Sequence, residues 1–211
     1  MTRATRRLLA LGAAAGPFYI VVGLLQMFLR EGFDPRRHAL SLLSNGDRGW
    51  VQIANFLVSG GLVLAGAIGI RRACRAQPAG TWAPVLLTFY ALGLVGAGIF
   101  RADPADGFPP GAPPFHGLTR SGLLHFVCGG IGFYAVIAAC FVFARRFARA
   151  RERGFAWWSI ATGVVFFIAF AGVASGAKSA AVMLTFYVAV AWLWIWHVSV
   201  HLHVRAAERS G

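Results

Sequence analysis

Cysteine is scarce in this chain of 211 residues, and so are acidic residues: there are three Cys and only seven Asp and Glu. Cys74 falls in a predicted loop, while Cys128 and Cys140 lie within one apolar stretch, so no pair is placed to build a disulfide framework. No complete catalytic motif is present either. The sequence therefore indicates topology much more clearly than chemistry.

The shortage of acidic residues leaves a formal net charge of +13, a value that by itself suggests nucleic-acid binding. The distribution of the charge favours another explanation, because the arginines concentrate in every second gap between long apolar stretches. Membrane insertion and the attraction of anionic lipid headgroups account for arginines in such gaps. We therefore expect no nucleic-acid partner.

Room for a separate soluble domain is also lacking, since 58% of the residues are hydrophobic and the mean hydropathy is +0.65. Six apolar stretches fill nearly the whole chain, and each is close to the roughly 20 residues that a helix needs to cross a hydrocarbon layer of about 30 Å. The sequence predicts an all-α fold, a single integral membrane domain over residues 1–211 that is a bundle of six transmembrane helices. The predicted spans are residues 8–29, 51–70, 83–100, 122–144, 155–176 and 180–202.

The basic residues predict the orientation of this bundle. With the N-terminus in the cytoplasm, 13 of the 20 Lys and Arg residues lie in inner segments and 7 in outer segments. Basic loops stay on the cytoplasmic side, so both termini are predicted to be cytoplasmic, with residues 30–50 and 101–121 outside. The first stretch resembles a signal peptide, but its apolar character continues to Leu29, beyond the usual core of about 7–15 residues. We interpret it as an uncleaved first span.

The second outer loop, residues 101–121, holds five of the nine prolines. Proline fixes its own φ angle and restricts the residue before it, so we expect this loop to be extended and stiff. Two interpretations remain open: the loop is a cap that closes a pocket over the helix ends, or it only connects two helices.

Polar side chains gather near the outer ends of the predicted spans. At this depth a polar group costs free energy unless it is paired or faces a wet cavity. Gln and Asn often hydrogen-bond neighbouring helices, which explains each residue singly; several at one level favour a polar vestibule that opens outward. The residues are Gln26, Gln52, Asn55, His125 and Ser175 in the spans, and Asp34, His38, Ser41, Ser44, Asp103 and His116 in the loops.

Neither a metal nor another cofactor is predicted. The histidines of the outer side have suitable chemistry but no diagnostic ligand spacing, and only His125 is clearly intramembrane, so a pair of haem ligands is incomplete. His197 and His201 lie on one helix face, but at the inner end among tryptophans. An interfacial anchor explains that pair.

Three short motifs carry a resemblance to a known family. The first is Ser41-Leu42-Leu43-Ser44 followed by Trp50, the second is Gly-Ile-Phe-Arg-Ala-Asp at residues 98–103, and the third is His116 with Leu124-His125-Phe126. Over its whole length the chain resembles the bacterial membrane proteins known as the domain of unknown function 998 family. This resemblance implies a six-helix protein of the bacterial inner membrane without an established activity, with Asp103, His116 and His125 as a polar signature.

The absence of a recognisable nucleophile–base pair favours a non-enzymatic function. We expect a multi-pass protein of the inner membrane that binds a small amphiphile or lipid in the outward-facing vestibule, or that supports a membrane complex as a homo- or hetero-oligomer. The alternative is a membrane enzyme acting on a lipid-linked or lipophilic substrate, with His116 or His125 as acid or base and Asp103 orienting it. In either case we expect these three residues to converge, with His38 and Asn55 as neighbours.

Overall fold

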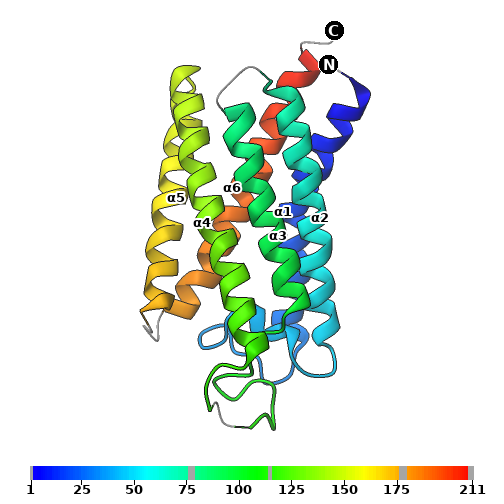
Figure 1. Cartoon of the computed structure of the whole chain (residues 1–211), viewed down its shortest axis with the longest axis vertical. Coiled ribbons are helices and arrows are strands. Elements are labelled where there is room, and N and C mark those ends of the chain that lie inside the picture. Colours follow the sequence, from blue (N-terminus) through cyan, green and yellow to red (C-terminus); the bar gives the residue numbers. More distant parts are fainter. Residues whose placement is uncertain (1, 76–78, 114–115, 176–179, 209–211) are drawn as a thin grey trace.

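Six long helices run side by side in the computed structural model, which describes residues 2–75, 79–113, 116–175 and 180–208, with side chains at 173–174, 180–187 and 206–208 outside the description (Figure 1). The predicted turn at residues 176–179 also lies outside it. The helices are α1 (Arg3–Leu29), α2 (Gly49–Ala73), α3 (Ala79–Ile99), α4 (Arg120–Arg149), α5 (Arg153–Ala174) and α6 (Ala180–Glu208), and a short 3₁₀ helix, η1, spans Leu40–Ser44.

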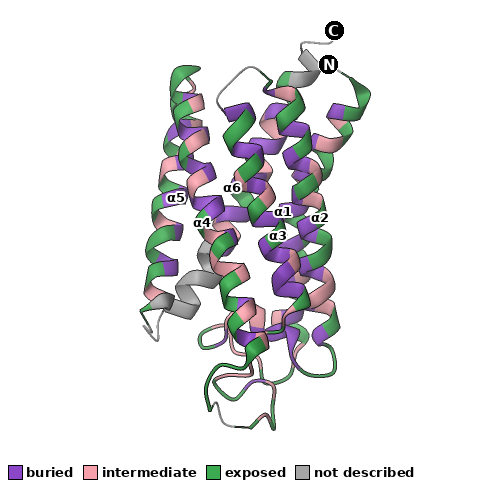
Figure 2. Ribbon diagram, viewed as in Figure 1, coloured by how far each residue is buried: buried purple, intermediate pink, exposed green. Residues whose placement is uncertain are grey.

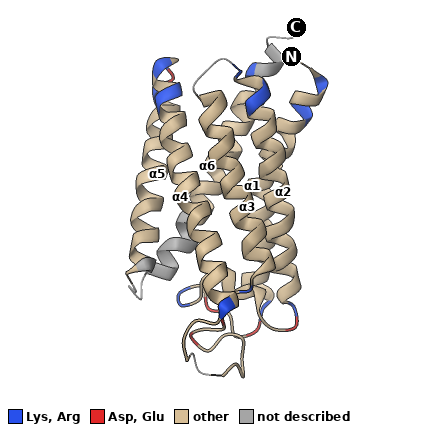
Figure 3. Cartoon of the chain, in the orientation of Figure 1, with Lys and Arg blue, Asp and Glu red and all other residues tan. Residues whose placement is uncertain are grey.

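Five of these helices, α1 to α5, are long and apolar enough to cross a membrane. Figure 3 shows Lys and Arg at the two ends of the described bundle and none in its middle, as insertion into hydrocarbon requires. The all-helical membrane architecture predicted from the sequence is therefore confirmed. The count of six spans and the cytoplasmic location of both termini remain predictions.

The helices extend beyond the apolar stretches that predicted them. The first one begins at Arg3 rather than at residue 8, because the Thr2 side chain accepts a hydrogen bond from the Thr5 amide and caps the helix. The fourth continues to Arg149, well past residue 144. Hydropathy marks only the part of a helix that hydrocarbon covers, whereas the backbone stays helical into the interface.

The six helices form a closed ring. Each packs against the next one along the chain, and α6 returns to pack against α1. Inside the ring the Trp192 side chain is fully buried; its ring centre lies 4.7 Å from that of Tyr19 on α1 and 5.5 Å from that of Tyr90 on α3. Figure 2 shows the buried residues facing this interior and the exposed ones facing outward. Aromatic side chains thus fill the middle of the bundle.

Gly12 and Gly16 on α1 allow close helix contacts. A Cβ atom at Gly12 would lie 2.6 Å from the Gly66 Cα on α2, and one at Gly16 would lie 2.5 Å from the Trp192 carbonyl oxygen on α6. Any larger residue would push these backbones apart. One face of α1 therefore holds two neighbouring helices at close range.

Two loops cover the end of the bundle opposite the termini (Figure 1). Residues 30–48 pack on the described parts of the second loop, residues 101–113 and 116–119, around a small core of Leu42, Leu43 and Phe108, all of them buried. We call this pair of segments the loop cap. Gly32 and Gly46 have positive φ angles of 75° and 71°, and prolines of the second loop pack against both.

Candidate functional site

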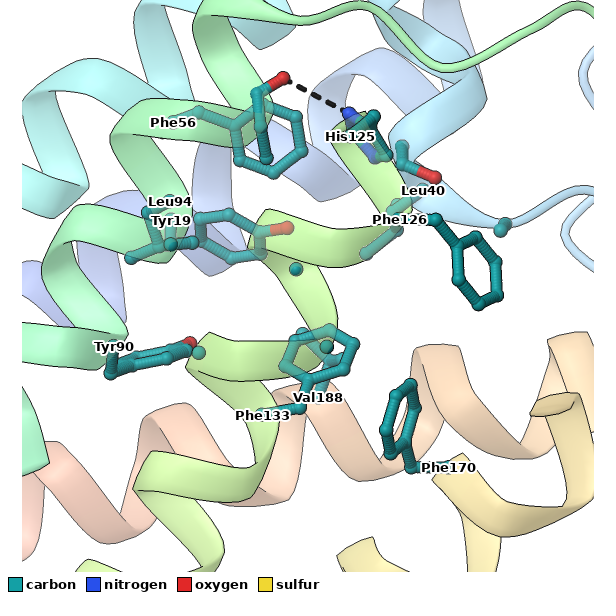
Figure 4. Close-up of a pocket in the computed structure, with 17 residues that line it drawn as sticks. Tyr19, Leu40, Phe56, Tyr90, Leu94, His125, Phe126, Phe133, Phe170 and Val188 are labelled. Carbon is teal, nitrogen blue, oxygen red and sulfur yellow. Dashed lines mark hydrogen bonds between the residues drawn. The ribbon is translucent and has the colours of Figure 1, made fainter. Parts of the chain in front are cut away.

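A cavity of about 130 Å³ lies directly beneath the loop cap. All six long helices and the cap contribute to its wall, which is mostly aromatic and aliphatic with a few polar groups (Figure 4). Phe126 lines the cavity and is 48% exposed, so the cavity reaches the surface of the bundle. The residues that line it are Tyr19, Ala39, Leu40, Ser41, Phe56, Tyr90, Gly93, Leu94, Ala97, His125, Phe126, Gly129, Gly130, Gly132, Phe133, Phe170 and Val188.

His125 is the one imidazole that lines this cavity. Its Nδ1 lies 3.1 Å from the Ala97 carbonyl oxygen and 2.8 Å from the Phe100 carbonyl oxygen (Figure 4 draws the first of these bonds). Carbonyl oxygens only accept hydrogen bonds, so Nδ1 carries a proton and donates it. In the neutral ring Nε2 is therefore an acceptor, and His125 offers a lone pair rather than a proton.

The same contacts give His125 a structural role. The last turn of α3 leaves carbonyl oxygens without helical partners, and the imidazole on α4 takes up those of Ala97 and Phe100. The ring is 8% exposed and packs 6.1 Å, centre to centre, from Phe56. His125 thus holds the end of α3 against α4 through Nδ1, while the edge of the ring that carries Nε2 takes no part in these bonds.

His38 joins the two halves of the loop cap. It is 3% exposed; its Nδ1 accepts a hydrogen bond from the Asp34 amide at 2.9 Å, and its Nε2 donates to the Asp106 carbonyl oxygen at 3.1 Å. Its ring also packs against those of Phe33 and Phe108. His38 therefore ties the first outer loop to the second, and both of its ring nitrogens are occupied.

Arg30 reinforces the cap from the end of α1. Its guanidinium donates to the carbonyl oxygens of Leu43 and Asn45 and lies 5.4 Å from the centre of the Phe108 ring. Partial burial, followed by repulsion from Arg48, lowers the pKa of Arg30 from its ordinary value, and Asp47 opposes this effect. Sequence reasoning counted Arg30 only as an outer charge and missed this role.

A buried amide network lies between α1 and α2, beside the cavity. Gln26 donates to Gln52 Oε1 at 2.7 Å, Asn55 donates to the same oxygen at 3.2 Å, and Ser59 donates to Asn55 at 3.3 Å. Asn55 also donates to the Tyr19 carbonyl oxygen, which connects the network to a residue that lines the cavity. These amides therefore form hydrogen bonds between α1 and α2. This is one of the two roles that the sequence left open, the other being to line a polar vestibule.

Asp103 stabilises the start of α4. Its carboxylate accepts hydrogen bonds from the Thr119 amide at 2.8 Å and from the Thr119 hydroxyl, whose oxygen in turn accepts from the Gly122 amide at 3.1 Å. The negative charge also lies at the positive end of the helix dipole. A Cβ atom at Gly122 would lie 2.0 Å from the carboxylate, so glycine at this position makes room for Asp103.

The remaining candidates from the sequence are dispersed. Ser41 lines the cavity, and Ser44 is buried in the cap, where its hydroxyl donates to the Ser41 carbonyl oxygen. His116 and Ser175 are exposed. Asp103 and His125 belong to the same α3–α4 junction, but among the described residues no hydrogen bond joins them to each other or to His116.

The described part of the chain holds no cluster of side chains that could bind a metal ion. No three or more His, Cys, Asp or Glu residues there are close enough together to hold an ion. Near the termini, Glu152 instead binds His201 at 2.9 Å and Arg205 at 3.1 Å. His201 thus contacts a carboxylate at the end of the bundle.

Sequence reasoning missed most of the cavity wall. Tyr19, Tyr90 and Gly129 lie within apolar stretches, where their types are unremarkable for a membrane helix. No spacing in the sequence marks them as neighbours, because they come from three different helices. Of the polar residues that the sequence singled out in the spans, His125 is the one that lines the cavity.

One comparison with known proteins gives a match. The model of the family described as "Protein of unknown function (DUF998)" matches residues 13–202. Comparisons with curated proteins and with solved structures give no match. The matched range covers all the cavity-lining residues and both loops of the cap.

Proposed function

We propose that this chain, which belongs to the DUF998 family, is a multi-pass membrane protein that binds an amphiphile or lipid in the cavity beneath the loop cap. The observation that carries the proposal is the wall of that cavity: mostly aromatic and aliphatic side chains from six helices, with a few polar groups that include the His125 imidazole. Ligand sites are typically apolar pockets with a few placed polar groups.

The size of the cavity restricts what enters it. A cavity of about 150 Å³ holds a benzene molecule, so about 130 Å³ holds a ring or a short stretch of chain rather than a whole lipid. The rest of the ligand would extend past the exposed Phe126. An amphiphile with its apolar segment inside fits this shape.

The chemistry of His125 restricts the polar part of the ligand. Because Nδ1 is committed to two carbonyl oxygens, Nε2 accepts a hydrogen bond in the neutral ring. The matching group on the ligand is a donor such as a hydroxyl or an amide N–H. The enzymatic alternative has no comparable support, since Asp103 is bound to Thr119 and His116 is exposed.

Glycine substitutions test the proposal. A Cβ atom at Gly129 would meet no atom within 4 Å, and the residue lines the cavity, so Gly129→Leu fills the cavity without a backbone clash. Gly61 on α2 is equally free of neighbours and lies outside the cavity, so Gly61→Leu is the matched control. The probe is a palmitoyl amide with a mid-chain diazirine, photolysed with the purified protein.

We expect the probe to label residues 126–133 in the unmodified protein and in Gly61→Leu. In Gly129→Leu we expect labelling of these residues to fall about tenfold, because a probe that is kept out of the cavity loses most of its contacts with the wall. Equal labelling in both variants, or labelling spread evenly over the lipid-facing surface, would show that the cavity is not a binding site.

A second pair of variants separates the two edges of His125. Asparagine keeps a donor near the position of Nδ1 and removes Nε2, so His125→Asn is expected to unfold near the normal temperature yet bind a hydroxyl-bearing probe more weakly. His125→Ala loses both edges and is expected to unfold earlier as well. If His125→Asn binds like the unmodified protein, the imidazole has only its structural role.

A further inference from the structure

A second, separate groove lies at the end of the bundle that carries the termini, between α2 and α3. Its volume is about 450 Å³. One end of the groove is formed by Arg71, Arg72 and Arg75, and the rest by mainly apolar residues. These are Ala67, Ile68, Thr81, Pro84, Val85, Thr88, Phe89 and Leu92.

The arginines of this groove have no carboxylate within ion-pair distance among the described residues; Glu152 contacts His201 and Arg205. The sequence between Asp47 and Asp103 contains no acidic residue at all, and both of these belong to the loop cap at the opposite end of the bundle. Arg71 donates to the Gly80 carbonyl oxygen and the Thr81 hydroxyl, which holds the start of α3 against the end of α2. Arg72 and Arg75 are exposed.

The apolar wall of the groove is open to the surroundings of the bundle. Val85 is 42% exposed, Phe89 49% and Leu92 54%. From Thr81 to Leu92, α3 rises about 16 Å at about 1.5 Å per residue, which is close to half of a hydrocarbon layer of about 30 Å. The groove thus has the depth of one lipid leaflet.

We propose that this groove binds one anionic glycerophospholipid of the adjacent leaflet. The phosphate lies against Arg72 and Arg75, and one acyl chain lies along Val85, Phe89 and Leu92. Guanidinium groups match phosphate oxygens in charge and in planar geometry, and no protein carboxylate in the described part of the chain competes for them. This site shares no residue with the cavity beneath the cap, so it does not rest on the function proposed above.

Native mass spectrometry of the purified protein tests the site, with phosphatidylglycerol and phosphatidylcholine of identical acyl chains as probes. We expect one phosphatidylglycerol to be retained in preference to phosphatidylcholine, and its affinity to fall about tenfold or more in Arg72→Gln/Arg75→Gln. The control is Arg145→Gln/Arg149→Gln, which removes two exposed arginines of α4 from the same end of the bundle. We expect less than about a twofold change there, because only the diffuse attraction is reduced.

Three results would overturn the proposal: equal retention of the two lipids, no loss in the groove variant, or an equal loss in the control, which would indicate diffuse attraction only. Retention of glycerol 3-phosphate as strong as that of the lipid would exclude a role for the acyl chain. If the groove variant does not fold, the test is made on the unmodified protein with a phosphatidylglycerol that carries a diazirine. We expect this probe to label residues 67–92, and labelling confined to other segments would contradict the site. The Gly129→Leu variant is expected to retain phosphatidylglycerol normally.

Discussion

Asp103 and His125 show how single polar residues are used at the α3–α4 junction. Both are predicted to act together in one site. In the structure Asp103 binds Thr119, and His125 binds the carbonyl oxygens at the end of α3. A polar residue type indicates that a partner is needed, but not which partner it finds.

The first prediction concerns Asp103 and Thr119. Asp103→Asn removes a charge from the start of α4, and Thr119→Val removes the helix cap, so each is expected to lower the free energy of unfolding by about 1 kcal/mol. Because the two residues act through the same contacts, the double variant should lose little more than the worse single one. Thermal unfolding in detergent measures these differences.

The control for this cycle is Asp106→Asn, which makes the same chemical change in the same loop. Asp106 contributes its backbone carbonyl oxygen to the cap, whereas its side chain makes no hydrogen bond among the described residues. Strictly additive losses in the double variant, or an equal loss in the control, would contradict the capping role of Asp103.

Among the elements, the loop cap departs most from an ordinary pair of connections. The sequence predicted stiffness for residues 101–121 from their prolines, but it did not predict η1, the buried Phe108 or the bonds of His38. These features depend on two loops that are about 70 residues apart in the chain. Local chemistry predicts the conformation of one loop more readily than the pairing of two.

The stability of the loop cap is expected to depend on His38. His38→Ala removes one hydrogen bond within the first loop, from the Asp34 amide, and one between the loops, to the Asp106 carbonyl oxygen, which keeps its bond from Arg37. The expected cost is about 1–3 kcal/mol. We expect amide hydrogen exchange in residues 30–48 and 101–113 to accelerate. Exchange in the middle of α2 and α3 should stay slow.

His116→Ala is the matched control, since it removes an imidazole from the same cap at an exposed position. Its exchange is expected to match that of the unmodified protein. Similar acceleration in both variants would mean that the cap depends on general loop composition and not on the bridge made by His38.

For the molecule as a whole, the helices were predictable because hydrocarbon imposes a length and an apolar composition on every span. The cavity was not, because Tyr19, Tyr90 and Gly129 meet only after three helices have packed, and nothing in their local sequence records that meeting. Gln52 and Asn55 were conspicuous as polar residues, and they hydrogen-bond Gln26 and the Tyr19 carbonyl oxygen across the contact between α1 and α2. Polarity in a span therefore located the region of interest without identifying its wall.

The orientation of the bundle in the membrane, with both termini in the cytoplasm, is a further prediction. Single cysteines at Ala112 and Ala150, introduced after replacement of the three native cysteines, lie at opposite ends of the bundle. A membrane-impermeant maleimide added to intact cells should label the Ala112 variant and leave the Ala150 variant unlabelled until the cells are opened, because basic segments stay in the cytoplasm. The reverse pattern would place both termini outside.

The contact between α1 and α6 determines when the bundle becomes complete. Of the six helices, α1 is synthesised first and α6 last, yet the Trp192 backbone of α6 packs directly against Gly16 of α1. A nascent chain truncated before α6 therefore has an unfilled interface on its oldest helix, and Tyr19 lacks the indole that stacks on it. The ring therefore closes only once α6 has been inserted, and until then both α1 and α5 lack a packing partner.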